Sequence, residues 1–309
     1  MAIVILRNDE KTGLWKAALK KHRPDIPVYG PGDAFDPGEV KMAAVWKHPP
    51  GSLSAFPNLL GIHGLGAGVD FIMEDETISP EIPVMRVVDP YLASDMAEFV
   101  LAEIAGILKR LQRYKYNEAS ALWQPEAYKR FSEVTVGIMG LGELGLVVAA
   151  SLRSIGMSVV GWTRNSTPEV AFPVYSGISG RTDFLKQAEV LVCLLPLTPQ
   201  TRGILNTEVF RNLPFGASLI NVARGPLLVD DDLLHALDQG LLSEACLDVF
   251  HNEPLPGEHP FWKHPSVHIT PHIASVSHPD SVAPQILSNY NKLLTGDTPA
   301  NLVSRKAGY

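Results

Sequence analysis

A strand that runs into a glycine-rich turn and then into a helix constrains this chain more than any other feature. Residues 134–139 are mostly apolar, and Gly140, Gly142 and Gly145 follow them as G-x-G-x-x-G, before apolar residues at helical spacing. This order is typical of a dinucleotide-binding βαβ unit. Gly140 would allow the tight turn, Gly142 would let the backbone approach a pyrophosphate, and Gly145 would let the helix lie close to the strand.

Short apolar strands alternate with helical segments along the rest of the chain. The strands are predicted at residues 3–6, 43–46, 59–63, 84–88, 134–139, 158–162, 190–195, 218–223, 245–250 and 267–270. A long amphipathic helix is predicted from Met96 to Leu111, after the breaker Pro90, and another from about residue 281 to 294. This alternation of strands and helices predicts an α/β fold of two Rossmann-like, doubly wound parallel-sheet domains.

The strongest strands lie in the middle of the chain, which indicates that one domain is inserted into the other. We expect a substrate-binding domain of residues 1–95 plus 280–309. The inserted dinucleotide-binding Rossmann domain is expected at residues 96–279.

Composition excludes several classes of function. The chain has 309 residues and a net charge of −7, with 46% hydrophobic and 19% charged residues. No basic run occurs, so nucleic acid is not expected as a partner. The apolar runs fall short of the roughly 18 residues that a membrane span needs, and the N-terminus lacks a signal-peptide pattern. We therefore expect a cytoplasmic protein that has no membrane partner.

Both cysteines, Cys193 and Cys246, lie inside apolar runs. A small buried thiol is the commonest outcome for such a residue. The sequence accordingly predicts two core cysteines, and neither a disulfide nor a metal site is predicted.

The second strand of the Rossmann unit ends without the acidic residue that bonds the ribose 2′-hydroxyl of NAD in this fold. Thr163, Arg164 and Asn165 stand there instead. The missing carboxylate removes repulsion toward a 2′-phosphate, and a guanidinium offers a planar donor fork that suits a phosphate. NADP(H) is therefore the predicted cofactor, with NAD(H) possible. The alternative is that Arg164 is an ordinary solvated arginine.

Three polar residues follow three predicted strands: Arg224 after 218–223, Glu253 after 245–250 and His272 after 267–270. Carboxyl ends of parallel strands share one edge of the sheet, which also carries the glycine loop. Beside a nicotinamide, this trio fits hydride transfer to a 2-oxo acid, whose carbonyl oxygen must receive a proton. An imidazole supplies protons near neutral pH, Glu253 would orient it, and Arg224 would polarise the carbonyl and pair with the carboxylate. Each residue alone could instead be structural.

Residues 140–145, 221–225, 247–256 and 270–272 resemble, in order and spacing, the D-isomer-specific 2-hydroxyacid dehydrogenase family. The resemblance extends over nearly the whole chain. Residues 45–50, 65–70, 122–125 and 308–309 look further like its bacterial glyoxylate/hydroxypyruvate reductase branch. The resemblance implies NADPH-dependent reduction of small 2-oxo acids, glyoxylate to glycolate and hydroxypyruvate to glycerate.

The resemblance also implies a catalytic set of Arg224, Glu253 and His272, with His272 as the proton donor. The cofactor is expected to contact Gly140, Gly142, Glu143, Leu144, Gly145, Thr163, Arg164, Asn165, Leu195, Pro196, Thr201, Val222, Ala223, Asp248 and Ser275. The substrate is expected to contact Trp46, Leu65, Gly66, Ala67, Gly68, Arg224 and His272. Backbone N–H groups of Ala67 and Gly68 would hold its carboxylate. A core position for Trp46 and a plain turn at 65–68 are the alternatives.

Members of the family are typically homodimers, which implies a homodimer here, joined through the coenzyme domain and the long helix near residues 93–116. Trp123 occupies a place comparable to that of a tryptophan that reaches the partner's active site in related reductases. Ser275 stands where many members have glycine, so the shape of the pocket there stays open.

Two other functions remain open from the sequence. The chain could reduce another 2-oxo acid, such as phenylpyruvate or a branched-chain keto acid, because the sequence does not determine the size of the pocket. It could also be a non-catalytic dinucleotide sensor, like the corepressors that share this fold. A sensor of this kind would need no turnover.

Overall fold

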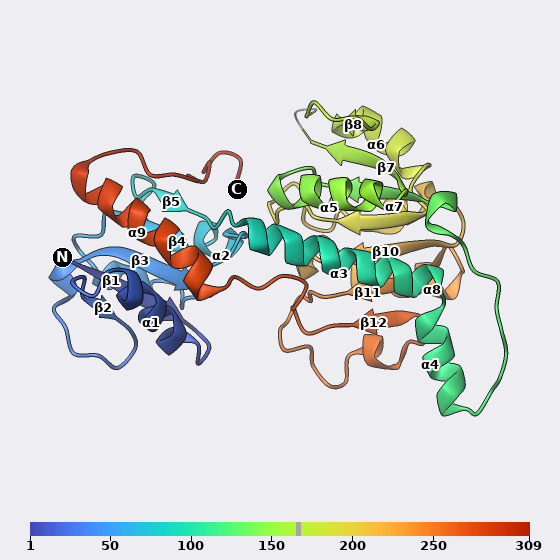
Figure 1. Cartoon of the computed structure of the whole chain (residues 1–309), viewed down its shortest axis with the longest axis horizontal. Coiled ribbons are helices and arrows are strands. Elements are labelled where there is room, and N and C mark those ends of the chain that lie inside the picture. Colours follow the sequence, from blue (N-terminus) through green and yellow to red (C-terminus); the bar gives the residue numbers. More distant parts are fainter. Residues whose placement is uncertain (165–167) are drawn as a thin grey trace. The chain divides into compact units, whose positions relative to one another are not determined.

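Two separate parallel sheets organise the chain (Figure 1). The computed structural model describes residues 1–164 and 168–309. The chain divides into a first unit of Met1–Leu92 and Val276–Tyr309 and a second unit of Ala93–Ser275. The predicted fold class, two doubly wound parallel-sheet α/β domains, is confirmed.

The first unit has a five-stranded sheet in the order β2-β1-β3-β4-β5. Its strands and helices are β1 (Ala2–Arg7), α1 (Thr12–His22), β2 (Val28–Tyr29), η1 (Pro37–Glu39), β3 (Val40–Trp46), η2 (Ser52–Ala55), β4 (Gly61–Gly64), α2 (Asp70–Met73), β5 (Val84–Met85) and α9 (Pro279–Thr295), where η marks a short 3-10 helix. After α9 the chain returns to β5, where the backbone N–H of Val303 donates to the carbonyl of Val84 at 2.8 Å. The C-terminal segment is therefore part of the first unit.

The second unit has a seven-stranded parallel sheet in the order β12-β11-β10-β9-β6-β7-β8. Helix α3 (Pro90–Leu108) leads into it from the first unit. The other elements are α4 (Leu111–Ala119), η3 (Phe131–Glu133), β6 (Thr135–Met139), α5 (Glu143–Ser154), β7 (Ser158–Thr163), β8 (Val174–Ser176), α6 (Gly177–Leu185), β9 (Val190–Cys193), α7 (Thr207–Asn212), β10 (Ala217–Asn221), η4 (Gly225–Leu227), α8 (Asp230–Asp238), β11 (Leu242–Leu247), η5 (Pro260–Lys263) and β12 (Val267–Ile269). The strand order reverses between β6 and β9, which is where folds of this kind bind ligands.

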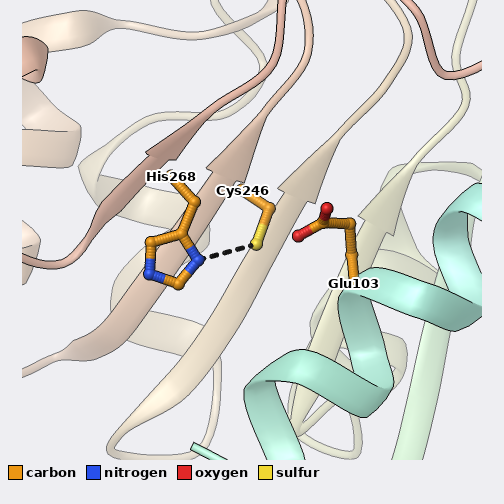
Figure 2. A group of neighbouring side chains, drawn as sticks. All are labelled: Glu103, Cys246 and His268. Atoms are coloured by element: carbon orange, nitrogen blue, oxygen red, sulfur yellow. Dashed lines mark hydrogen bonds between the residues drawn. The ribbon is translucent and has the colours of Figure 1, made fainter. Parts of the chain in front are cut away.

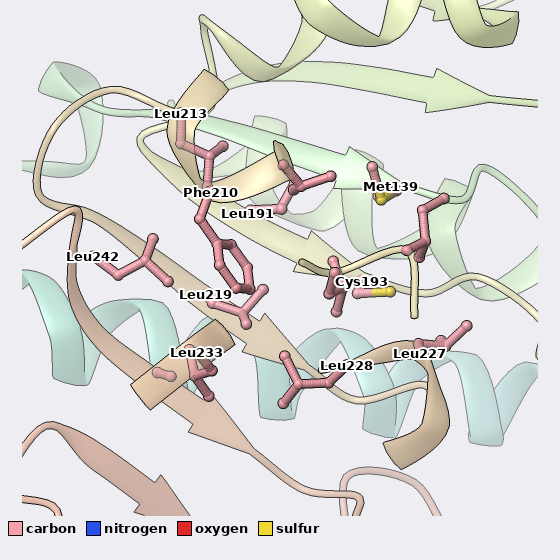
Figure 3. Close-up of a cluster of buried hydrophobic side chains, with 14 of the residues drawn as sticks. Met139, Leu191, Cys193, Phe210, Leu213, Leu219, Leu227, Leu228, Leu233 and Leu242 are labelled. Carbon is pink, nitrogen blue, oxygen red and sulfur yellow. The ribbon is translucent and has the colours of Figure 1, made fainter. Parts of the chain in front are cut away.

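Both faces of the larger sheet are buried, as an all-parallel sheet requires. On one face, residues of α3 and α5 pack against alternate residues of the strands, among them Ile138, Val192 and Cys246. On the other face, residues of α6, α7 and α8 surround Leu191, Cys193 and Leu219 (Figure 3). Cys193 is 0% and Cys246 is 4% exposed, so the predicted burial of both cysteines is confirmed.

Several predicted elements differ from the observed ones. The six strands predicted for the second domain are seven in the structure, and the first domain has one more strand than predicted, because β8 and β2 were missed. They are three and two residues long, too short to show a strand periodicity. The predicted breaker Pro90 is the first residue of α3, a position that proline tolerates, and Arg110 with φ +57° separates α3 from α4.

Among the described residues, none of the helices combines the length and the apolar character that a membrane span demands.

Candidate active site

The glycine-rich loop joins β6 to α5, at the point where the strand order of the larger sheet reverses. Gly140 has φ +111°, and a Cβ there would meet the backbone carbonyl of Leu194 at 2.8 Å. A Cβ at Gly145 would overlap the carbonyl oxygen of Gly140, whereas one at Gly142 would meet nothing within 4 Å. Gly140 and Gly145 therefore serve the turn and the close packing, while Gly142 leaves open backbone at the N-terminus of α5. This arrangement fits a dinucleotide pyrophosphate.

The end of β7 is the position where a dinucleotide fold reads the ribose. Thr163 is buried there, and Arg164 is half-buried with its Nη1 donating to Oε1 of Gln200 at 3.4 Å. The predicted cofactor residue Asn165 lies outside the described residues. A guanidinium at this strand end, without a carboxylate beside it in residues 163–168, suits a 2′-phosphate better than a free 2′-hydroxyl.

A buried asparagine shapes the turn that carries Arg224. Asn221, which ends β10 and is 0% exposed, donates from Nδ2 to the carbonyl of Arg224 at 3.1 Å and accepts at Oδ1 from the N–H of Ala223 at 3.2 Å. A Cβ at Gly225 would overlap the backbone of Phe250, so this turn lies directly against the segment that follows β11. Only glycine allows this approach, which sets the Arg224 turn beside the segment that holds Glu253.

Glu253 and His272 form the most direct contact of the site. Nδ1 of His272 lies 2.8 Å from Oε2 of Glu253, and Oε1 of Glu253 accepts from the N–H of Phe250 at 3.1 Å. Both side chains are partly exposed, by 26% for His272 and 19% for Glu253. Because Nδ1 faces the carboxylate, Nε2 is the ring nitrogen that can exchange a proton with a substrate. The carboxylate holds the ring in place.

Asp248 organises the loop that presents His272. Its side chain is 1% exposed; Oδ1 accepts from Oγ1 of Thr270 at 2.6 Å and from the N–H of Ile273 at 2.9 Å. Its Oδ2 accepts from the N–H of Ala274 at 2.9 Å. The bonds lie on both sides of His272, whose φ of +55° is unusual for a residue with a side chain. We attribute the position of the imidazole to this buried carboxylate.

The predicted substrate residues of the first unit lie at the carboxyl ends of β3 and β4. Trp46 is half-buried, and its ring meets that of Phe71 edge to face with 5.6 Å between the centroids. A Cβ at Gly66 would meet Cζ3 of Trp46 at 2.5 Å, so the tryptophan lies against the loop 65–68. Leu65 and Gly66 are buried, while Ala67 and Gly68 are half-buried. The structure thus brings these residues together within their unit.

A family model described as "D-isomer specific 2-hydroxyacid dehydrogenase, NAD binding domain" matches residues 101–274. The chain belongs to the D-isomer specific 2-hydroxyacid dehydrogenase family. This dehydrogenase is 40% identical over 303 residues to glyoxylate/hydroxypyruvate reductase A of Serratia proteamaculans (strain 568), a match that covers 96% of each chain. The family that the motifs indicated is confirmed.

Two solved structures are similar to the dehydrogenase over its full length. A D-isomer specific 2-hydroxyacid dehydrogenase from Xanthobacter autotrophicus Py2, in complex with NADPH and MES, has a TM-score of 0.94 and 37% identity, and the match covers 100% of this chain and 99% of that one. An NADPH-dependent glyoxylate/hydroxypyruvate reductase from Sinorhizobium meliloti, in complex with NADP and sulfate, has a TM-score of 0.92 and 33% identity, with the same coverage.

The remaining predicted cofactor residues of the dehydrogenase lie in the second unit. Glu143 and Leu144 begin α5, Leu195, Val222 and Ala223 are buried at strand ends, Pro196 and Ser275 are half-buried, and Thr201 is buried. Oγ1 of Thr201 donates to the carbonyl of Pro196 at 2.7 Å, which orders the loop after β9. Their contacts with a cofactor stay predictions.

Sequence reasoning missed the residues that hold the dehydrogenase's site together. Asn221, Gly225 and Thr270 had no predicted role, and Asp248 was expected only as a cofactor contact. The available signal was a polar residue at the end of an apolar strand, as in 218–221 and 245–248. Such a residue needs buried hydrogen-bond partners, but the sequence does not name them.

Proposed function

We propose that this chain catalyses the NADPH-dependent reduction of small 2-oxo acids, glyoxylate to glycolate and hydroxypyruvate to glycerate. One observation carries the proposal: the imidazole and carboxylate of His272 and Glu253 lie 2.8 Å apart, at the edge of the sheet where the glycine loop also lies. The named relatives support the choice of substrate, since the Serratia proteamaculans and Sinorhizobium meliloti proteins are glyoxylate/hydroxypyruvate reductases.

The residues of the second unit fit NADP(H). Gly140, Gly142 and Gly145 would hold the pyrophosphate on the N-terminus of α5, and Thr163 and Arg164 would hold the 2′-phosphate. When bound, NADPH supplies the hydride that reduces the carbonyl carbon of the substrate. NAD(H) could bind less tightly, because the ribose site lacks the acidic residue that NAD favours. We accordingly propose residues 96–279, which nearly coincide with the second unit, Ala93–Ser275, as the NADP-binding domain.

His272 would donate its Nε2 proton to the carbonyl oxygen as negative charge develops there. The resulting neutral ring would regain a proton from solvent, with Glu253 holding Nδ1 throughout. Arg224 would bind the substrate carboxylate and polarise the carbonyl, which a planar fork of N–H donors suits. Residues 1–95 plus 280–309, which nearly coincide with the first unit, are proposed as the substrate-binding domain. Trp46 and residues 65–68 would contact the substrate.

A matrix of cofactors and substrates tests this proposal. The purified full chain is mixed with NADPH or NADH and with glyoxylate, hydroxypyruvate, phenylpyruvate or a branched-chain 2-oxo acid, and the loss of reduced-nicotinamide absorbance is followed. We expect the highest kcat/KM for NADPH with glyoxylate or hydroxypyruvate. A preference for the bulky acids would shift the assignment to another 2-oxo acid reductase. Cofactor binding without turnover of any acid would indicate a dinucleotide sensor instead.

Replacement of the proton donor tests the mechanism. His272→Ala should lower kcat for reduction by about 100-fold or more, because general acid catalysis typically contributes that much. His235→Ala, on the exposed face of α8, is the matched control and should keep the wild-type rate. Turnover of His272→Ala within a few-fold of wild type would contradict the assignment.

We also propose a homodimer. Helix α4 stands off the sheet of the second unit (Figure 1), and large apolar side chains in this helix and after it are exposed. Trp123 is 97% exposed, and Tyr116 and Tyr128 are 61% and 62% exposed. Exposed aromatic side chains of this kind are typical of a protein interface. Light scattering on a sizing column should give twice the chain mass of 33.6 kDa, whereas a monomer would refute this part. A cytoplasmic location belongs to the proposal and agrees with the two free, buried cysteines.

A further inference from the structure

Three side chains with different metal-binding atoms converge on the face of the larger sheet that α3 covers (Figure 2). Glu103 comes from α3, Cys246 from β11 and His268 from β12. A carboxylate oxygen, the thiol sulfur and an imidazole nitrogen lie within 4.8 Å of one another, and Sγ of Cys246 is 3.4 Å from Nδ1 of His268. The cluster shares no residue with the candidate active site.

The fold brings this cluster together through strand register and helix packing. Cys246 and His268 are register partners on neighbouring parallel strands, so their side chains point to the same face. Helix α3 packs on that face through apolar residues such as Val100, Ile104 and Ile107, which sets Glu103 above the thiol. All three positions are thus determined by rigid elements and not by loops.

We propose that Glu103, Cys246 and His268 bind one Zn²⁺ ion through a carboxylate oxygen, Sγ and Nδ1. Zinc sites in proteins use these three ligand types with bonds of about 2.0–2.3 Å, which in a tetrahedron sets the ligand atoms roughly 3.3–3.8 Å apart. The separation of 3.4 Å between Sγ and Nδ1 lies within that range, and the other separations, which are at most 4.8 Å, would close on binding. A water molecule would take the fourth position. On binding, the thiol releases its proton to the buffer and the thiolate bonds to the metal.

A fourth side chain orients the imidazole. Oε2 of Glu244 lies 3.5 Å from Nε2 of His268, and Oε1 of Glu244 lies 3.5 Å from Nη1 of Arg110. With a slightly closer approach, Nε2–H would donate to this carboxylate, which would leave Nδ1 able to bind a metal. Carboxylate–histidine–zinc arrangements in proteins use the same pattern.

A nucleophilic role fits the same atoms less well. The order of thiol, imidazole and carboxylate is that of a cysteine hydrolase, but Cys246 is only 4% exposed. A reactive cysteine must be accessible to its substrate, and this thiol is buried. A metal ion that holds secondary-structure elements together needs no such access. Zinc here would tie α3 to β12, the edge strand of the sheet, which pairs with β11.

Metal titration of the full chain tests the proposal. The protein is stripped with a chelator, desalted, and titrated with Zn²⁺ against a chromophoric competitor and with Co²⁺ by absorption spectroscopy. We expect one equivalent of each metal, a thiolate-to-Co²⁺ charge-transfer band, and a higher melting temperature with Zn²⁺. Cys246→Ala should lose the band, and Glu103→Gln and His268→Gln should each weaken Zn²⁺ binding about tenfold or more.

Matched variants separate this site from binding elsewhere. Cys193→Ala removes the other buried thiol and His235→Ala removes an exposed imidazole, and both should bind metal as the wild type does. The proposal is overturned if the wild type shows no charge-transfer band, or if Cys246→Ala binds Zn²⁺ as tightly as the wild type. Should Cys246→Ala not fold, unchanged affinity in both Glu103→Gln and His268→Gln would overturn it equally.

Discussion

Replacement of Asp248 by asparagine should destabilise the second unit and displace His272. Both carboxylate oxygens of Asp248 accept hydrogen bonds, two at Oδ1 and one at Oδ2, and the side chain is 1% exposed. An asparagine amide has only one oxygen, so its NH₂ group must face at least one of these donors. One buried N–H or O–H is then left without an acceptor, and the remaining bonds lose the assistance of the charge.

The size of the effect follows from these contacts. An unsatisfied buried polar group costs about 1–3 kcal/mol, and hydrogen bonds to charged groups are stronger than neutral ones, so we expect a loss of about 2–4 kcal/mol. For a unit of this size, that loss corresponds to a fall in melting temperature on the order of 10 °C. The imidazole would also move relative to the substrate, and a displacement near 1 Å can cost about 100-fold in rate. We expect kcat to fall by roughly 10–100-fold.

Thermal unfolding without cofactor, NADPH affinity and kcat together test the reasoning. Asp280→Asn makes the same chemical change at an exposed ion pair with Lys21 and should alter none of the three. Thr270→Val removes only the hydroxyl donor and should cost less than Asp248→Asn. If Asp248→Asn weakens NADPH binding but leaves the melting temperature and kcat at saturating NADPH unchanged, Asp248 is a cofactor contact and not the anchor of the His272 loop.

Three further predictions concern the substrate, the cofactor and pH. Arg224→Lys keeps the charge but loses the planar fork, so kcat/KM for glyoxylate should fall by about tenfold or more; an unchanged value would exclude bidentate binding. Arg164→Ala should raise the KM for NADPH by about tenfold and leave that for NADH nearly unchanged, and equal losses would refute a 2′-phosphate contact. Complete burial lowers the pKa of His63 to about 4 in the folded chain. As the pH falls, this imidazole is therefore protonated in the unfolded chain before it is protonated in the folded chain, and protonation favours unfolding. The contribution of His63 to the free energy of unfolding should therefore be fully present above pH 6.5 and fall by about 3 kcal/mol toward pH 4. Denaturant titrations should show this slope in the wild type and a flatter one in His63→Gln. An equal slope in both proteins would contradict the prediction.

The features that the sequence predicts well are those set by local backbone requirements. Gly140 must adopt a positive φ, and Gly145 must lack a side chain, so the residue type alone predicts the conformation at these positions. Arg224, Glu253 and His272 could be placed at one edge because the carboxyl ends of parallel strands always meet there. By contrast, strands β2 and β8 are too short to show a periodic pattern in the sequence. Arg110 adopts a left-handed conformation, which is not expected of an arginine.

Contacts between residues far apart in the sequence account for what could not be predicted. The position of Asp248 at a strand end resembles that of a ligand contact, yet its partners Thr270, Ile273 and Ala274 lie more than twenty residues away. The role of Asp248 can be seen only in the folded chain, because a buried carboxylate must accept hydrogen bonds from the donors that lie near it in space.

Cys246 shows the same limit in another form. Its apolar neighbours correctly predict burial, since residues inside a parallel strand are covered on both faces. They do not predict that β12 sets His268 beside it in register, or that α3 brings Glu103 over it from 143 residues earlier in the chain. A search of the sequence for the spacing of metal ligands therefore does not find this group. The three residues come together only through the pairing of two strands and the packing of a helix on the sheet.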